Sequence, residues 1–574
     1  MKIINYVLAG AIGFGSLVGC GVAHKDGAQL TSTVQFKKGE VVAQFDKFYA
    51  NYVNEMSPLY TAANTAYFDA SVNNSEENWN KYAEMDMKMN AIMSNAAKFD
   101  TIKAFMMSNE ITDPLKVRQL KVMYNDFMTM QVDTSISNQL TQMNSKIEGK
   151  FSGFRAKVNG KELSDNQVED ILIKSADNKE LEQVWTEQKK IGRLVAKDII
   201  ALAKKRNEVA RKSGFDNYHT MCLARNEQDP KEIEKLFDEL DNLTRNAFAK
   251  EKAKMDVILA KKVGIKPSEL MPWNYQNRFF QEAPSIYDLD IDKYFKDKDV
   301  VKLTEEYYAT LGMPINEMVA KSDLYEKPGK NQHAYCTNIN RDQDVRVLCN
   351  VKNNESWMST LLHEFGHALY EKHYSKDLPW NLKNAAHIFT TEGIAMMFER
   401  LPLNTNWLRD FMKVPESDIQ KMQKNIENTV ILQKLVFSRW VQVMYRFEKG
   451  LYANPDQDLN KLWWDLVEKY QMIKKPKGRN EPDWATKIHV ATFPCYYHNY
   501  MLGELFASQL YFTLAKQIGQ DGMQNPSFIG KKEIGKYLID NVFSIGMRYK
   551  WEDMVQRCTG EPLTAKYYAK QYVK

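Results

Sequence analysis

Two histidines four residues apart are the clearest chemical signal in the chain. His363 and His367 enclose the sequence His-Glu-Phe-Gly-His within the apolar residues 361–369. On a helix this spacing places both imidazoles on one face, one turn apart, where they can bind a single metal ion. Glu364 follows the first histidine, and its carboxylate can accept a proton from a metal-activated water. We predict a catalytic site for one Zn²⁺ ion, because neutral imidazole suits zinc.

A catalytic zinc site needs a third protein ligand, which we expect on the next helical stretch, residues 384–399. Glu392, 25 residues beyond His367, is the predicted ligand. Glu399, two turns further along the same face, and His387, five residues before Glu392, are the alternatives. A buried helix with two hydrogen-bonded histidines is the structural alternative to the whole site, but the acidic residues at a suitable distance favour the metal.

The composition is typical of one large, mainly helical domain. The 574 residues include only 17 prolines and 26 glycines, and no low-complexity linker or repeat divides them. We predict a single helical domain over residues 41–574. The 78 basic and 73 acidic residues nearly cancel, and a net charge of +5 is no signature of nucleic-acid binding.

The first forty residues differ from the rest. Lys2 precedes the apolar residues 7–14, and Leu-Val-Gly then leads to Cys20. We predict a secretory signal over residues 1–19 and a flexible tether over residues 20–40. The ending resembles the lipobox of bacterial lipoproteins, which implies a lipidated Cys20 that anchors the protein to a membrane in the cell envelope, with the outer membrane favoured. An uncleaved membrane anchor is the alternative.

Two short runs before the metal helix predict a β-hairpin. Residues 333–340 and 345–349 have strand composition on either side of a polar turn. An edge strand beside a peptidase metal can pair with an extended substrate backbone. Cys336 and Cys349 flank the turn, and a disulfide between them stays open because spacing cannot settle pairing. The asparagines at 353–354 are both good caps for the metal helix.

Polar side chains suited to peptide hydrolysis are concentrated near the C-terminus. Lys487 and His489 are followed by the tyrosine-rich residues 496–500. Peptide hydrolysis builds negative charge on the carbonyl oxygen, which histidine and tyrosine donors can stabilise, while a lysine can hold a substrate carboxylate. Tyrosines also pack commonly at surfaces, so this cluster indicates a catalytic role only in combination with the predicted zinc site.

With these residues in view, the chain resembles the peptidyl-dipeptidase A family, the angiotensin-converting-enzyme-like zinc peptidases. The likeness spans nearly the whole mature sequence and is strongest at His-Glu-Phe-Gly-His with Glu392, at residues 326–334 and at residues 464–490. It implies the fold of a gluzincin metallopeptidase. That fold is mainly α, a large helical ellipsoid with a deep central cleft and a small β-hairpin beside the zinc helix.

The resemblance also implies catalytic roles. His363, His367 and Glu392 would bind zinc, and Glu364 would activate the water. Tyr500 would stabilise the oxyanion of the transition state.

Substrate contacts follow from the same resemblance. His333 and the backbone of Ala334 would contact the substrate chain, and His489 would bind a substrate carbonyl. Lys487 and Tyr497 would grip the C-terminal carboxylate, the contact by which such enzymes release dipeptides from that end.

The chain departs from the family pattern at several positions. Tyr497 and Tyr500 match the tyrosine pair of the family, but Tyr496 is an alternative to Tyr497. The family also has a glutamine that helps hold the substrate carboxylate, and Gln276 is only an approximate match for it. Val467 and Asn499 replace two arginines associated with chloride binding, so chloride activation is not expected. Met396 replaces an acidic residue that orients a zinc histidine, which leaves that histidine without an assigned partner.

These observations together predict a lipid-anchored zinc peptidyl-dipeptidase that hydrolyses short peptides in the cell envelope. An endo-oligopeptidase similar to thimet oligopeptidase is one alternative. A peptide-binding lipoprotein that has lost catalysis is another, but the intact general base at Glu364 argues against it.

Overall fold

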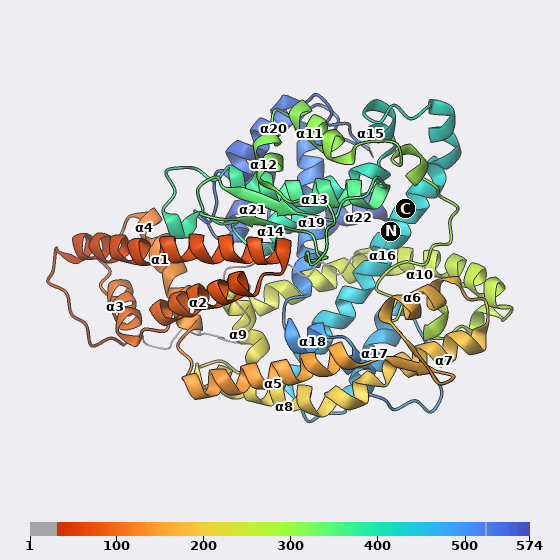
Figure 1. The fold of residues 1–574 in the computed structure, drawn as a ribbon, viewed down its shortest axis with the longest axis horizontal. Helices are drawn as coiled ribbons and strands as arrows, with labels where there is room; N and C mark the ends of the chain where they lie inside the picture. Colours follow the sequence, from red (N-terminus) through yellow and green to blue (C-terminus); the bar gives the residue numbers. More distant parts are fainter. Residues whose placement is uncertain (1–30, 523–524) are drawn as a thin grey trace.

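The computed structural model describes residues 31–522 and 525–574, so the predicted signal and Cys20 lie outside the described residues. The described chain is mainly helical, as expected, with two small antiparallel sheets of two strands each (Figure 1). Among the described residues, no helix combines the length and apolar character needed to cross a bilayer.

The N-terminal helices form a lobe with a core of its own. The helices α1 (Val41–Asn73), α2 (Glu76–Met93), α3 (Ala96–Met107) and α4 (Pro114–Thr129) enclose a cluster of aromatic and methionine side chains. The chain just before α1 packs on this lobe, because Phe36 stacks on Phe105 and Thr33 bonds Asp100. The prediction of a loose tether over residues 20–40 therefore does not hold for residues 33–36.

Two tightly packed helices stand at the centre of the molecule. These are α13 (Glu355–Lys372), which begins at the Asn354 cap, and α14 (Ile388–Glu399). They approach closely because Gly366 faces Ala395, where a Cβ atom would lie 3.1 Å from the Ala395 Cα. Helix α19 (His498–Gln517) packs against α14 in the same manner, and a Cβ on Gly393 would lie 2.6 Å from the Phe506 ring. These contacts fix the positions of the side chains that α13, α14 and α19 present.

The predicted hairpin is present, although its strands are shorter than expected. Strand β3 (Tyr335–Asn338) pairs antiparallel with β4 (Val345–Leu348) and lies against α13. Cys336 pairs in register with Val347, two residues before Cys349. A disulfide needs Cα atoms within about 7 Å and facing Cβ atoms, which this diagonal offset does not provide. Both cysteines are free buried thiols, so the open disulfide pairing is not formed.

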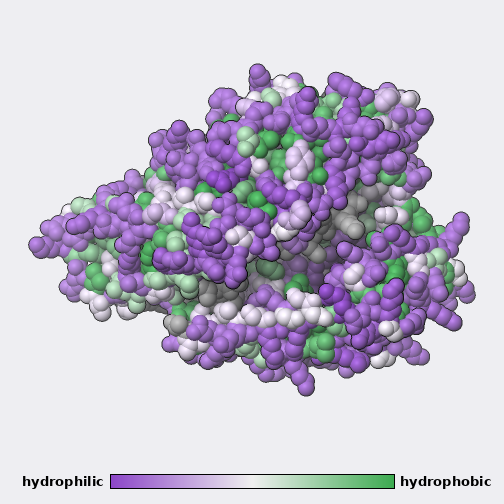
Figure 2. Space-filling view, viewed as in Figure 1, coloured by the Kyte–Doolittle hydropathy of each residue, from purple (hydrophilic) through white to green (hydrophobic). Residues whose placement is uncertain are grey.

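Long helices form the other half of the molecule. Figure 1 shows α5 (Thr134–Gly153) and α8 (Ile191–Lys212) on the side opposite α13, with α10 (Pro230–Val263) and α16 (Glu416–Ala453) crossing between the halves. Two short elements, η7 (Asp483–Thr486) and α18 (His489–Thr492), continue from this half toward α19. Figure 2 shows that this face is hollowed across its middle, between the two halves. The predicted central cleft lies here.

Candidate metal centre

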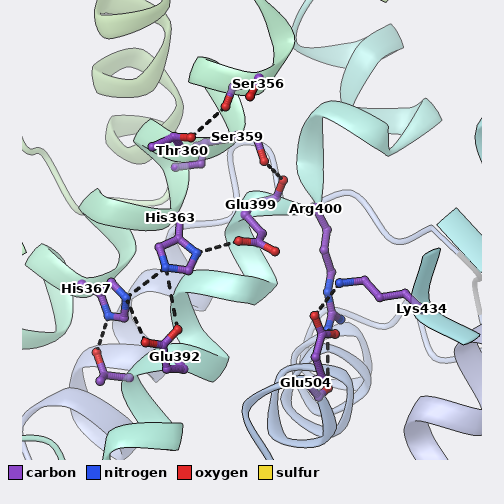
Figure 3. A network of polar contacts seen from close by, with 12 residues as sticks. Ser356, Ser359, Thr360, His363, His367, Glu392, Glu399, Arg400, Lys434 and Glu504 are labelled. Atoms are coloured by element: carbon purple, nitrogen blue, oxygen red, sulfur yellow. Dashed lines mark hydrogen bonds and ion pairs between the residues drawn. The ribbon is translucent and has the colours of Figure 1, made fainter. Parts of the chain in front are cut away.

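The three predicted zinc ligands meet at one point between α13 and α14. His363 and His367 lie one turn apart on α13, and their Nε2 atoms are 3.1 Å apart. The Glu392 carboxylate on α14 lies 3.8 Å from the His363 Nε2 and 4.0 Å from the His367 Nε2 (Figure 3). One ligand atom from each residue falls within 4.8 Å of the others. The structure therefore brings the predicted triad together.

The chemistry of this group fits zinc. Zinc binds histidine nitrogen and carboxylate oxygen at about 2.0–2.2 Å, and three protein ligands with one open position are typical of a catalytic site. Two nitrogens bound to one ion at that distance can be as close as the 3.1 Å between the histidine Nε2 atoms. His387 is no ligand, because it caps α14 and its Nδ1 accepts a hydrogen bond from the Phe389 N–H.

Each histidine is oriented by a partner on α14. The His363 Nδ1 lies 2.6 Å from a Glu399 carboxylate oxygen, and the His367 Nδ1 lies 2.7 Å from the Thr391 hydroxyl. These contacts leave both Nε2 atoms directed at Glu392, as a metal site requires. Burial alone would lower the pKa of His363, but the hydrogen bond to Glu399 and the carboxylates of Glu399, Glu364 and Glu392 together raise it to about 9.

Glu399 is therefore the acidic partner of His363, a role that the sequence left unassigned. Met396 occupies the position where an acid was expected, and Glu399 lies three residues further along α14. The alternative assignment of Glu399 as a zinc ligand is wrong in this geometry, because its carboxylate bonds the far nitrogen of His363.

Replacing Glu399 by glutamine should weaken zinc binding about 10- to 100-fold, because outer partners of metal ligands contribute that much. Competition with a chelator of known affinity measures the change. Ser359→Ala is the matched control, because the Ser359 hydroxyl bonds the Glu399 backbone oxygen at 2.8 Å and not its carboxylate. Equal zinc affinity in the Glu399→Gln and wild-type proteins would contradict this role.

Glu364 lies on the side of α13 that faces the hairpin. Its carboxylate is buried and within hydrogen-bonding reach of the Cys336 backbone on β3. Burial raises the pKa of Glu364 to about 7, and the neighbouring Glu392 adds to this effect. A carboxyl group with a pKa near neutrality is suited to take up and release a proton at pH 7.

One cavity joins the metal group to the polar residues predicted near the C-terminus. His363 and Glu392 line it together with His489, Tyr497 and Tyr500. His489 and Tyr500 are partly exposed to this cavity, whereas Tyr497 is buried with its ring edge against both. Burial keeps the pKa of His489 well below its usual range, so this imidazole is neutral and can donate one hydrogen bond.

Tyr497, and not Tyr496, belongs to this cavity. The Lys487 ammonium lies 5.5 Å from the centre of the Tyr497 ring, whereas the Tyr496 hydroxyl is buried without a hydrogen-bond partner.

Gln281, which the sequence did not identify, lines the cavity beside Lys487. The Lys487 Nζ donates a hydrogen bond to the Gln281 Oε1 at 2.6 Å, and Gln281 lines the cavity. Gln276 instead accepts a hydrogen bond from the Ser285 N–H, so its assignment is wrong. Burial, together with the Arg278 charge, lowers the pKa of Lys487 to about 7. A carboxylate bound here would restore the ammonium form, because opposite charge favours it.

Two predicted substrate contacts do not reach this cavity. Ala334 is buried just before β3, and His333 is exposed, but neither lines the space beside the metal group. Their predicted contacts with the substrate chain stay a prediction.

An ion cluster borders the cavity on its other side. The Glu504 carboxylate, one turn after Tyr500 on α19, bridges Arg400 and Lys434 (Figure 3). Glu504 and Lys434 line the cavity. These positions are far apart in sequence, and nothing in their local pattern identifies them.

Comparison with known proteins agrees with this geometry. The family model described as angiotensin-converting enzyme, Peptidase_M2, matches residues 40–572. The chain is similar to the angiotensin-converting enzyme of Rattus norvegicus, with 23% identity over 84% of this chain and 40% of that protein. It is also similar to the angiotensin-converting enzyme of Haematobia irritans exigua, with 22% identity over 71% of this chain and 72% of that protein.

The chain thus spans less than half the length of the mammalian relatives that it matches. A shorter match of 25% identity joins 35% of this chain to 29% of oligopeptidase PepF of Bacillus subtilis (strain 168). With a family match across most of its length and the His363, His367 and Glu392 group in place, the chain belongs to the angiotensin-converting enzyme family of metallopeptidases.

Proposed function

We propose that the protein is a zinc-dependent peptidyl-dipeptidase that releases C-terminal dipeptides from short peptides. The observation that carries this proposal is the single cavity that holds both the metal group and the Gln281 partner of Lys487. A buried cation beside an amide is suited to a free carboxylate. A substrate held there by its C-terminus would present a bond near that end to the metal group.

Zinc bound by the triad would polarise the scissile carbonyl and lower the pKa of a water. Glu364 would take the proton of the attacking water and pass it to the leaving amine. His489 and Tyr500 line the same cavity and would donate hydrogen bonds to the carbonyl oxygen as it gains negative charge. The acidic partner at Glu399 and the intact base at Glu364 argue against a binding protein without catalysis.

Replacing Lys487 by alanine should lower kcat/KM about 100-fold for free-acid peptides and leave C-terminally amidated peptides unchanged, because only the free acid loses a charged partner. Initial rates on matched acid and amide pairs measure this. Lys189→Ala is the control, since Lys189 is also a buried lysine, bonded to Thr486 instead of Gln281. Equal loss on both substrate forms would contradict the proposal.

An endo-oligopeptidase is the second candidate, and the partial match to PepF favours it. The two candidates differ in their products. Digestion of a peptide mixture followed by mass spectrometry should give dipeptides removed stepwise from the C-terminus. Internal fragments of varied length would favour the second candidate.

Chloride should not activate the enzyme. The Asn499 side chain accepts a hydrogen bond from Gln228 at 2.8 Å, and the other end of Gln228 bonds His498. The Gln228 amide is thus bonded at both ends, and a neutral asparagine stands where an anion-binding arginine would be needed. Rates in chloride and in acetate at equal ionic strength are expected to agree, and a rise in chloride alone would contradict this.

We also propose that the protein is lipid-anchored through Cys20 in a bacterial cell envelope. The proposal rests on the sequence of residues 1–20. Metabolic labelling with a fatty acid, lost in Cys20→Ser, tests it.

A further inference from the structure

A second cavity lies beyond the metal group, at the other end of the α13 and α14 pair. The first cavity is lined by the early turns of α13 and the later turns of α14. The second is lined by Glu371 in the last turn of α13 and by His387, Ile388 and Thr391 at the start of α14. The two helices run antiparallel, since Ser359 bonds residue 399 and His367 bonds Thr391. The zinc triad therefore lies between the two cavities.

The second cavity adjoins the metal site directly. Thr391, which holds the His367 Nδ1 at 2.7 Å, is part of its lining. Glu371 follows His367 by four residues, so it lies one turn further along the face that carries the zinc ligands. A peptide that crosses the metal group from the first cavity would continue toward this one.

The N-terminal lobe covers this second cavity. Tyr52 and Tyr60 of α1 and Asp126 of α4 line it, together with Trp380 from the short helix η4 (Trp380–Leu382). The lobe reaches this part of the molecule through α1, which contacts β3, and through α4, which contacts η4. The walls thus combine aromatic rings with charged groups, in a space that the proposed catalytic steps do not use.

Two carboxylates of this cavity are poorly compensated. Within the described chain, neither the Glu371 nor the Asp126 carboxylate forms an ion pair, and Arg341 is the cation whose charge acts on both. Burial raises the pKa of Glu371 to about 8 and that of Asp126 to about 6, although the Arg341 charge lowers both, and neither carboxylate receives a hydrogen bond that offsets the burial. Both groups therefore favour a charged or hydrogen-bonding partner.

Of the other charges of the lining, Arg341 acts on both carboxylates and Arg225 on Asp126, but neither arginine forms an ion pair with them. The Arg341 guanidinium lies 4.4 Å from the Trp380 ring and 4.6 Å from the Tyr60 ring. Glu227 forms a two-pronged ion pair with Arg118, at 2.6 and 2.9 Å. Arg225 also lines the cavity but is exposed to solvent.

We propose that this cavity binds a positively charged group of the substrate on the N-terminal side of the scissile bond. The proposal rests on the proposed function, because Lys487 sets the direction in which the peptide lies. An ammonium or guanidinium group would pair with Glu371 and Asp126 and pack against the Tyr52 ring, because Arg341 already covers Tyr60. A basic side chain and the free N-terminus of a short peptide both offer this chemistry.

The test compares acetylated free-acid peptides that carry arginine or its neutral isostere citrulline at each of the three positions before the cleaved bond. We expect kcat/KM to be about tenfold higher for arginine at one of these positions. Glu371→Gln and, separately, Asp126→Asn should each remove most of that preference. Zinc content and circular dichroism show that both variants fold, and the ratio of arginine to citrulline rates within each variant measures the preference.

Glu317→Gln is the matched control. It removes the same charge next to the end of α13, where Glu317 pairs with Lys372 at 2.9 Å on the exposed surface. It should keep the full arginine preference. A second arm compares free and acetylated N-termini on the citrulline peptides, and a preference for the free form that depends on Glu371 identifies the N-terminus as the bound group.

Three outcomes would overturn the inference. These are no preference for a cation in either arm, a preference that Glu371→Gln and Asp126→Asn both leave intact, and a preference for acidic residues. Failure of the proposed function is separately visible. Internal cleavage with a cation preference that depends on Glu371 would reject dipeptide release and keep the cation site. Dipeptide release without that preference would keep the proposed function and reject the cation site.

Discussion

Glu364→Gln should lower kcat about 1,000-fold, within the range that general acid–base catalysis contributes. Glutamine keeps the shape of the side chain and its place beside the Cys336 backbone, but it cannot accept the proton of the attacking water. Zinc content should stay at the wild-type value, because Glu364 contributes no atom to the metal group. Steady-state rates on a blocked tripeptide, with elemental analysis of the same sample, measure both quantities.

The control for this variant is Glu355→Gln. Glu355 is another largely enclosed carboxyl group on α13, and burial raises its pKa to about 7 as well. It lies in the first turn of the helix, apart from the metal group. Near-normal activity is expected in this control. An active Glu364→Gln enzyme with full zinc content would show that another group activates the water.

Glu392→Ala should remove zinc from the protein. It deletes one of three ligands, so the loss of affinity should exceed the 10- to 100-fold expected from an outer partner such as Glu399. Zinc content after dialysis against a chelator should fall from one ion per chain to almost none, and peptide hydrolysis should fall with it. Met396→Leu, one turn further along α14, is the control and should retain both. Retention of zinc by the alanine variant would assign the third ligand elsewhere.

The metal group and the helices that carry it could be predicted from sequence, because the information is local. The spacing of His363 and His367 sets both side chains on one face of a helix, and apolar residues around them indicate burial. Glu392 lies on the next helix along the chain, and the short connection limits where it can go. The hairpin was predicted for the same reason, from residue types and a polar turn.

Contacts between distant segments were not predictable in this way. Gln281 meets Lys487 across 206 positions, and it lies in an irregular stretch with no periodic pattern. Glu399 is an alternative zinc ligand on the sequence alone. The sequence shows which residues share a helix face, but it does not show which imidazole nitrogen of His363 the carboxylate reaches. The second cavity depends on α1 and α4 closing over α13, which no local signal indicates.

X-ray absorption at the zinc edge tests the central claim most directly, because it reports the atoms bound to the ion in the purified protein. The triad predicts two imidazole nitrogens and one carboxylate oxygen at about 2.0–2.2 Å, with a further light atom in the open position. Loss of one imidazole in His367→Ala should be visible in the same spectrum. A sulfur shell at about 2.3 Å, or a spectrum without histidine, would contradict the account, because it would place the metal at a cysteine or at the surface.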